Sequence, residues 1–278
     1  MTPREHPLPS QGVNAGAARP APPACVGFLD RLSERTVYSS RGAEALAWAL
    51  SKRLGTQPVL VGTPGMVAES DWEEDLEDSR EHLADATRRV EEILAQGLQP
   101  VLFGGDCSIA LGTLPALAQY RPDAWLLWID AHGDFNSPDT TPSNYLGGMA
   151  LAGACGIWDT GLGLGPDLSR VVLCSTRDLD PDELKLIQAN DVQLVDAAGA
   201  ADALRGRDVF VHLDLDVLDP SVLPGTLQPV PGGLDEDQVQ QLLREVAGAA
   251  NLIGCEFTNM TAPELAGRIA GMVAPLFG

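Results

Sequence analysis

The chain has 278 residues, is 45% hydrophobic and carries a net charge of −21, from 18 basic and 39 acidic residues. This acidic balance, without any basic run, argues against nucleic acid or an anionic membrane as a partner. No apolar stretch is long enough to cross a bilayer and no secretion signal is recognisable, so we expect a soluble, cytoplasmic protein. The odd number of cysteines, five, without paired spacing indicates reduced thiols.

The order of the predicted elements indicates an α/β protein. Residues 1–24 contain six prolines among Ala, Gly and Ser, which predicts a flexible tail before one domain at residues 25–278. Strands are predicted at 58–61, 100–103, 124–130, 171–175, 208–215 and 252–257, and helices at 70–98, 108–119, 181–189, 235–249 and 262–276. Continuous apolar strands that alternate with helices predict a mainly parallel sheet covered on both faces.

Two of these strands end in candidate metal ligands, Asp130-Ala-His132-Gly-Asp134 and Asp214-Leu-Asp216. Residues two apart on a strand point to the same side, so each segment directs its polar groups into one space. In a parallel sheet this space is the crevice at the carboxyl ends of the strands. A lone Asp-x-Asp is ordinarily a turn, but four carboxylates around one imidazole would repel one another without bound cations. Such ligands suit Mn and, less exclusively, Fe, Co or Zn.

Three motifs together resemble the ureohydrolase family, which includes arginase and agmatinase. They are Gly-Gly-Asp-Cys-Ser at 104–108, Asp-Ala-His-Gly-Asp-Phe-Asn at 130–136 and Asp-Leu-Asp-Val-Leu-Asp-Pro at 214–220. The resemblance implies a three-layer α/β/α fold with a mainly parallel sheet, a binuclear manganese site and a guanidino substrate. It also implies a homo-oligomer, commonly a trimer or a hexamer.

The resemblance further implies how two Mn²⁺ ions would be held. The first ion would have the ligands Cys107, Asp130, Asp134 and Asp214, and the second would have Asp130, His132, Asp214 and Asp216. Asp130 and Asp214 would bridge the two ions. Two such ions lower the pKa of a shared water, which then attacks the planar guanidinium carbon.

Two carboxylates are expected to act directly on the reaction. Asp134 would accept a proton from the attacking water and pass it to the leaving amine. Glu256, at the end of another predicted strand, would hold the guanidinium through paired hydrogen bonds. The alternative for Glu256 is a strand-end carboxylate that faces solvent.

Two other stretches resemble arginase in particular. Asp180 and Glu183 take the places that bind the α-amino group of arginine, and Asn136 and Ser143 take the places that bind its α-carboxylate. The alternatives are an ordinary helix start at 180–183 and ordinary loop chemistry at 140–143. Together the four residues favour an arginine-like amino acid over agmatine, which has no carboxylate.

Two positions depart from the family pattern. Cys107 stands where the family usually has a histidine, and Gly147 stands where arginases have a histidine for proton transfer. A thiolate at 107 would weaken the first metal as a Lewis acid or favour softer metals, whereas a neutral buried thiol would leave that site weakly occupied. His212, two residues before Asp214, would either support a metal ligand or be an ordinary core histidine.

These departures favour a specialised guanidino hydrolase. Cys107 resembles the cysteine of family members that hydrolyse N-hydroxyarginine, whose hydroxyguanidine is less basic than a guanidine. We therefore expect a metal-dependent hydrolase of an arginine-like amino acid, with N-hydroxyarginine, cleaved to ornithine and hydroxyurea, as the first candidate substrate. The alternatives are an arginase or agmatinase that releases urea, and a metal-poor relative that only binds a guanidino ligand.

Overall fold

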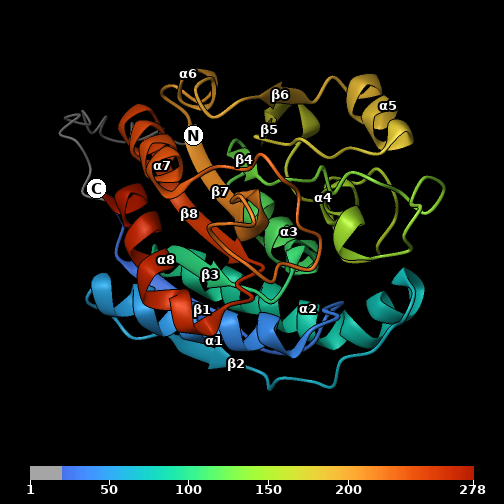
Figure 1. Ribbon diagram of the computed structural model, residues 1–278, viewed down its shortest axis with the longest axis horizontal. Coiled ribbons are helices and arrows are strands. Elements are labelled where there is room, and N and C mark those ends of the chain that lie inside the picture. The colour runs from blue at the N-terminus through green and yellow to red at the C-terminus, as the bar shows by residue number, and fades with distance from the viewer. Residues whose placement is uncertain (1–20) are drawn as a thin grey trace, which may run out of the picture.

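Eight parallel strands form one sheet through the centre of the protein (Figure 1). The structure is a computed structural model, and it describes residues 21–278. The strands are β1 (Pro23–Phe28), β2 (Val59–Val61), β3 (Gln99–Phe103), β4 (Trp125–Ile129), β5 (Val171–Cys174), β6 (Gln193–Val195), β7 (Asp208–Asp214) and β8 (Asn251–Thr258). Their order across the sheet is β2-β1-β3-β8-β7-β4-β5-β6. The parallel sheet predicted from the apolar strands is therefore confirmed.

Helices cover both faces of this sheet (Figure 1). They are α1 (Val37–Arg53), α2 (Trp72–Ala95), α3 (Ala110–Tyr120), α4 (Ala150–Ala154), α5 (Pro181–Ala189), α6 (Ala200–Ala203), α7 (Glu236–Ala249) and α8 (Ala266–Val273). One buried cluster joins the sheet to α1, α6, α7 and α8, and a second joins it to α2, α3, α4 and α5. Along β4, Leu127 and Ile129 belong to the first cluster, and Leu126 and Trp128 to the second. Both faces of the strand are buried, which explains its continuous apolar sequence and gives three layers, α/β/α.

Several element predictions need correction. Pro23 already pairs with Gln99 in the sheet, so the prediction that the flexible tail extends to residue 24 is wrong, and residues 1–20 lie outside the described part of the chain. A proline fits there because it is the first residue of its strand. The helix predicted at 262–276 is divided into two 3₁₀ turns, Pro263–Leu265 and Ala274–Phe277, around α8.

Five of the strands and α-helices in residues 21–278 were not predicted at all: β1, β6, α1, α4 and α6. The largest of them, α1, buries Ser39, Ala43 and Ala47 beside two leucines. Small side chains of this kind give only a weak apolar stripe, so helical periodicity is hard to recognise. Within residues 21–278, no helix combines the length and the apolar character needed to cross a bilayer.

Candidate metal centre and substrate pocket

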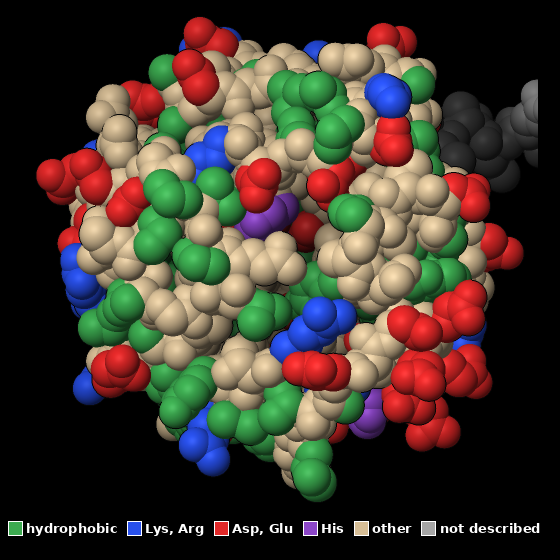
Figure 2. All heavy atoms as spheres, turned by 45° about the vertical axis from the view of Figure 1, so that its right-hand side comes forward, with side chains coloured by type: hydrophobic (Ala, Val, Ile, Leu, Met, Phe, Trp, Pro, Cys, Tyr) green, Lys and Arg blue, Asp and Glu red, His purple; other side chains and the backbone are tan. Residues whose placement is uncertain are grey.

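A pocket of about 220 Å³ lies at the carboxyl ends of the central strands. Every residue predicted to bind metal or substrate lines it, with the exception of Glu256. Figure 2 shows a hollow in which a histidine side chain lies beside acidic side chains. β3, β8, β7, β4 and β5 are neighbours in the sheet, so segments far apart in sequence deliver their side chains to this one edge.

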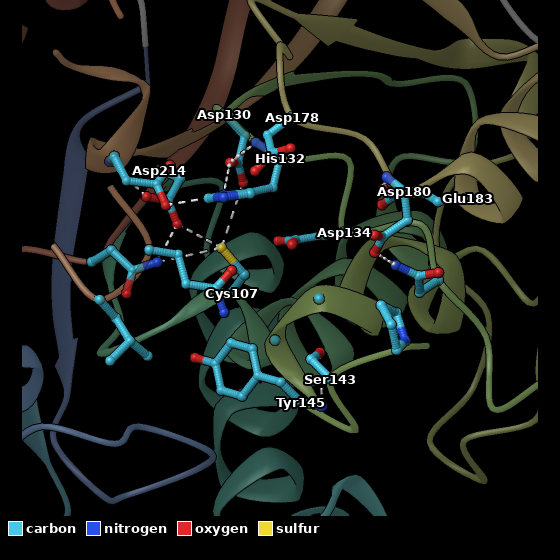
Figure 3. A pocket seen from close by; sticks show the side chains of 18 residues that line it. Cys107, Asp130, His132, Asp134, Ser143, Tyr145, Asp178, Asp180, Glu183 and Asp214 are labelled. Atoms are coloured by element: carbon cyan, nitrogen blue, oxygen red, sulfur yellow. Dashed lines mark hydrogen bonds and ion pairs between the residues drawn. The ribbon is translucent and has the colours of Figure 1, made fainter. Parts of the chain in front are cut away.

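Two groups of side chains in the described chain have the spacing of metal ligands. The first consists of Cys107, Asp130, His212 and Asp214, and the second of Asp130, His132 and Asp216. Within each group the ligand atoms lie within 4.8 Å of one another. Asp130 belongs to both groups, as a bridging ligand would. Asp134 belongs to neither, although Figure 3 shows its carboxylate pointing toward the sulfur of Cys107.

The carboxylates of these groups are fixed by their neighbours. Asp130 accepts hydrogen bonds from the backbone N–H of His132 (2.7 Å) and from Trp128 Nε1 (3.1 Å). Asp214 Oδ1 accepts from the backbone N–H of Asp216 (2.8 Å), and its Oδ2 accepts from the Cys107 thiol (2.8 Å). Asp130 and Asp214 are therefore each held in one orientation by neighbouring groups of the protein.

The electrostatics of the cluster call for bound cations. Burial, reinforced by the charge of Asp216, raises the pKa of Asp214 to about 6. Burial and the charge of Asp130 also raise the pKa of Asp134 well above its ordinary value, and that of Asp216 in the same direction. Burial acting alone would lower the pKa of His132, but Asp130 and Asp216 outweigh it and raise this pKa to about 12. Divalent cations would neutralise the negative charge that contributes to all four shifts in pKa.

The substrate-binding candidates gather at the other side of the pocket (Figure 3). Asn136 donates to Asp180 across 3.1 Å, which joins the loop after β4 to the loop after β5. Glu183 accepts from the backbone N–H groups of Phe135 (2.8 Å) and Asp180 (3.0 Å). Asp180 is also the N-cap residue of α5, and Glu183 lies in the first turn of that helix. The two residues therefore start a helix and line the pocket at the same time, so the two interpretations do not exclude each other. Burial raises the pKa of Glu183 to about 7.

Tyr145 and Asn259 line the pocket although they were not predicted as site residues. The Tyr145 hydroxyl donates to Asp106 Oδ2 across 3.2 Å, and burial holds its pKa well above 10, so it remains a neutral phenol. Asn259 hydrogen-bonds Asp214 and has a positive φ of 56°, a strained conformation for a residue with a side chain. Asp134 shares this strain, with φ at 47°. Asn259 comes just after the strand predicted at 252–257, and this position could have identified it as a candidate pocket residue.

Glu256 does not line the pocket, so the structure gives no support to the prediction that it holds the guanidinium. Its side chain is completely buried, so the alternative of a solvent-facing carboxylate is wrong. One carboxylate oxygen accepts from Thr113 Oγ1 (2.7 Å), and the other lies 2.9 Å from His212 Nδ1. Glu256 stands two residues before the end of β8 and faces Thr113 of α3, outside the lining of the pocket.

Gly147 has no room for the histidine found at this position in arginases. A Cβ atom there would lie 2.5 Å from Cε1 of Tyr145. We expect Gly147→Ala to lower the free energy of unfolding by about 1–3 kcal/mol because the tyrosine ring must move. Gly148→Ala is the matched control, since nothing lies within 4 Å of a Cβ at that position. Chemical denaturation compares the two variants, and equal stabilities would contradict the assignment of this space to Tyr145.

Metal binding is expected to strengthen as the pH rises. The raised pKa values of Asp214 and His132 mean that protons occupy part of the site near neutrality and must leave when a cation binds. We expect the apparent Kd for Mn²⁺ to fall at least about tenfold between roughly pH 5 and pH 8, with proton release on binding. Isothermal titration calorimetry in two buffers of different ionisation enthalpy measures both quantities. A Kd independent of pH would contradict this linkage.

Comparison with known proteins gives the family. A model of the arginase family matches residues 39–274. The N(omega)-hydroxy-L-arginine amidinohydrolase of Streptomyces lavendulae is 38% identical over 259 residues, covering 89% of this chain and 94% of that protein. The arginase of Bacillus caldovelox is 34% identical over 203 residues, covering 66% of this chain and 67% of that protein. Its solved structure matches with a TM-score of 0.82 at 26% identity, covering 93% of this chain and 98% of that one. As its motifs predicted, the chain belongs to the arginase family and is a hydrolase of amidine carbon–nitrogen bonds.

Proposed function

We propose that this protein hydrolyses N-hydroxy-L-arginine to ornithine and hydroxyurea. The observation that carries the proposal is the place of Cys107, whose sulfur lies in one ligand group with Asp130 and Asp214 at the bottom of the pocket. A thiolate there makes the first metal a weaker Lewis acid than an imidazole would. A hydroxyguanidine suits such a site because it is less basic than a guanidine. The similarity to a hydroxyarginine amidinohydrolase over most of the chain supports the same substrate.

The donor set fits two divalent cations, for which Mn²⁺ is our proposal. The repulsion between the carboxylates, and the position of His132 Nδ1 at 3.2 Å from Asp216 Oδ2 and 3.5 Å from Asp130 Oδ1, both fit a cation shared by these groups. We propose that the ions are held by Cys107, Asp130, His132, Asp134, Asp214 and Asp216. When bound, such ions lower the pKa of a shared water and polarise the guanidino group.

The protein supplies proton transfer through Asp134. Burial and nearby negative charge make this carboxylate more basic than an ordinary aspartate, which suits a group that accepts a proton near neutral pH. Water adds to the guanidino carbon, the bond from that carbon to the ornithine nitrogen breaks, and the proton held by Asp134 goes to that nitrogen. Asp134 lines the pocket with its carboxylate pointing inward (Figure 3), as this transfer requires.

The amino-acid end of the substrate would bind across the pocket. Asp180 and Glu183 offer acceptors to the α-ammonium group, and Asn136 and Ser143 offer donors to the α-carboxylate. The loops that carry these residues are tied together by the bonds from Asn136 to Asp180 and from Phe135 to Glu183. This end of the pocket therefore selects an amino acid over agmatine.

Ornithine release from N-hydroxy-L-arginine and from L-arginine, and putrescine release from agmatine, test the proposal. We expect kcat/KM to be highest for N-hydroxyarginine and lowest for agmatine. Ser143→Ala should raise KM for the two amino acids and leave agmatine unchanged, since agmatine has no carboxylate. A large preference for L-arginine would make the protein an ordinary arginase. No bound metal and no turnover after reconstitution with Mn²⁺ would leave it as a metal-poor relative that only binds a guanidino ligand.

We further propose that the enzyme works in the cytoplasm as a homo-oligomer, without nucleic-acid or membrane partners. The net charge of −21 supports the absence of those partners. All five cysteines are free, which suits a reducing compartment. Light scattering coupled to size-exclusion chromatography measures the assembly, for which a trimer or hexamer is expected. A monomeric mass at assay concentrations would contradict it.

A further inference from the structure

We infer that His212 is a direct ligand of the first metal, and that Cys107, Asp130, His212 and Asp214 form a four-coordinate site with a preference for Zn²⁺. The imidazole missing at position 107 is thus supplied from β7, two residues before Asp214. This inference rests on the proposed metal-dependent hydrolase and revises its first metal site. There His212 replaces Asp134 as a ligand, which leaves Asp134 its role in proton transfer, and Zn²⁺ replaces Mn²⁺. It concerns only the first ion, since the second group contains no sulfur.

The distances between the ligand atoms around His212 are close to those between neighbouring ligands of one tetrahedral metal ion. Its Nε2 lies 3.4 Å from Cys107 Sγ, and Cys107 Sγ lies 3.8 Å from Asp130 Oδ2. For a tetrahedral ion with ordinary metal–sulfur and metal–nitrogen bonds, neighbouring sulfur and nitrogen ligands are about 3.6 Å apart. The thiol of Cys107, already 2.8 Å from Asp214, completes the group when it gives up its proton.

The Nδ1 side of the His212 ring faces a carboxylate, as it does in many metal-binding histidines. His212 Nδ1 lies 2.9 Å from Glu256 Oε1, and Thr113 Oγ1 donates to the other oxygen of the same carboxylate. A carboxylate accepts the Nδ1 proton, which leaves the lone pair of Nε2 directed at Cys107. This gives Glu256 a positioning role in place of the substrate contact that its sequence suggested.

The ring of His212 has no freedom to turn away. Trp128 stacks on it with ring centroids 3.5 Å apart and planes 2° from parallel. The same indole donates its N–H to Asp130 Oδ2, so one side chain holds two ligands of the site. His212 is completely buried, and its Nε2 contacts Cys107 Sγ and Thr258 Oγ1, each at 3.4 Å, so this nitrogen is directed into the ligand group.

The composition of this group points to zinc. Zn²⁺ binds thiolate, imidazole and carboxylate ligands in tetrahedral sites, whereas Mn²⁺ prefers oxygen ligands in larger shells. The second group consists of two carboxylates and His132 and has no sulfur, so its ligands are harder than those of the first group. We therefore expect one equivalent of Zn²⁺ to bind much more tightly than Mn²⁺, and a second metal to bind with less discrimination.

X-ray absorption on a His132→Asn protein loaded with one equivalent of Zn²⁺ tests the ligand set without any substrate. Among the remaining histidines, His82 lies on α2 with a side chain 41% exposed, and His6 is outside the described residues. We expect zinc to show a sulfur neighbour together with imidazole scattering, and the imidazole signal to disappear in His132→Asn/His212→Asn. Sulfur without imidazole would overturn the inference, and so would imidazole scattering that survives in the double variant.

Zinc affinity of the single variant gives an independent measurement. Asparagine keeps an amide close to the place of Nδ1, where it can still donate to Glu256, but it lacks Nε2. We expect His212→Asn to weaken the first Zn²⁺ by about 100-fold or more, since loss of an outer partner alone costs about 10–100-fold. The control His82→Asn should bind normally. Unfolding of the metal-free proteins shows whether the variant still folds, and unchanged zinc affinity in a folded variant would contradict the inference.

The two proposals fail in different ways. Hydrolysis of N-hydroxyarginine by a protein whose zinc shows no second imidazole would refute the role of His212 and leave the proposed function standing. A zinc site with sulfur and His212 in a protein that turns over no guanidino compound would do the reverse.

Discussion

The variant Asp130→Asn is expected to lose both metals and to lower kcat/KM by about 10³-fold or more. Asp130 is the one residue common to the two ligand groups of the described chain. Asparagine keeps the volume of the side chain but removes the negative charge that both cations need. A bound metal supplies several kcal/mol of transition-state stabilisation, and about 4 kcal/mol corresponds to a thousandfold in rate.

Metal analysis of the purified variant and steady-state kinetics measure the two effects. Asp85→Asn is the matched control, because Asp85 lies on the exposed surface of α2 in an ion pair with Arg88. Charge loss there should change neither metal content nor rate. Two equivalents of metal in Asp130→Asn would contradict the assignment of Asp130 as the bridging ligand.

Glu256→Ala is expected to destabilise the metal-free protein by about 3 kcal/mol or more. The change leaves His212 Nδ1 and Thr113 Oγ1 buried without their common partner. Removing one member of a buried hydrogen-bonded pair of this kind costs roughly 3–5 kcal/mol. In a domain of this size, 3 kcal/mol lowers the Tm by roughly 6–12 °C.

Thermal unfolding of the apoprotein measures the loss, with Glu77→Ala on the surface of α2 as the control. The side chain of Glu77 is 74% exposed, so its loss should cost little. A role in holding the guanidinium would give a different result, a raised KM with nearly unchanged stability. That second outcome would return Glu256 to the substrate and remove the support for His212.

The sequence was a good guide wherever a local pattern carries the information. The position of Asp130, His132 and Asp134 directly after a predicted strand was enough to predict that they lie at the carboxyl edge of the sheet. Their directions could not be predicted from the two-residue period of a strand, because β4 ends at Ile129 and all three lie in the loop that follows. Helix α5 was predicted with its observed ends because Pro181 follows an N-cap aspartate. By contrast α1 was missed, since its buried face consists largely of small residues.

Glu256 and His212 show what local patterns do not contain. Both stand near the end of a strand, and each therefore looked like a candidate for the pocket or for an ordinary core position. Whether such a residue lines the pocket or lies in the core depends on how far below the strand end it lies and on which side chains pack against it there. Thr113 from α3 and Trp128 from β4 provide those contacts, and neither is near in sequence to the residues that it holds.

The sequence by itself determined the family, the parallel sheet and the carboxylates that we propose as metal ligands, because ligand identity and the apolar character of strands are local properties of the chain. Only the tertiary structure decided that Glu256 faces inward, that Tyr145 fills the space beside Gly147, and that His212 stands behind Cys107. These facts depend on the close packing of side chains from different elements, in which each space is taken by one neighbour.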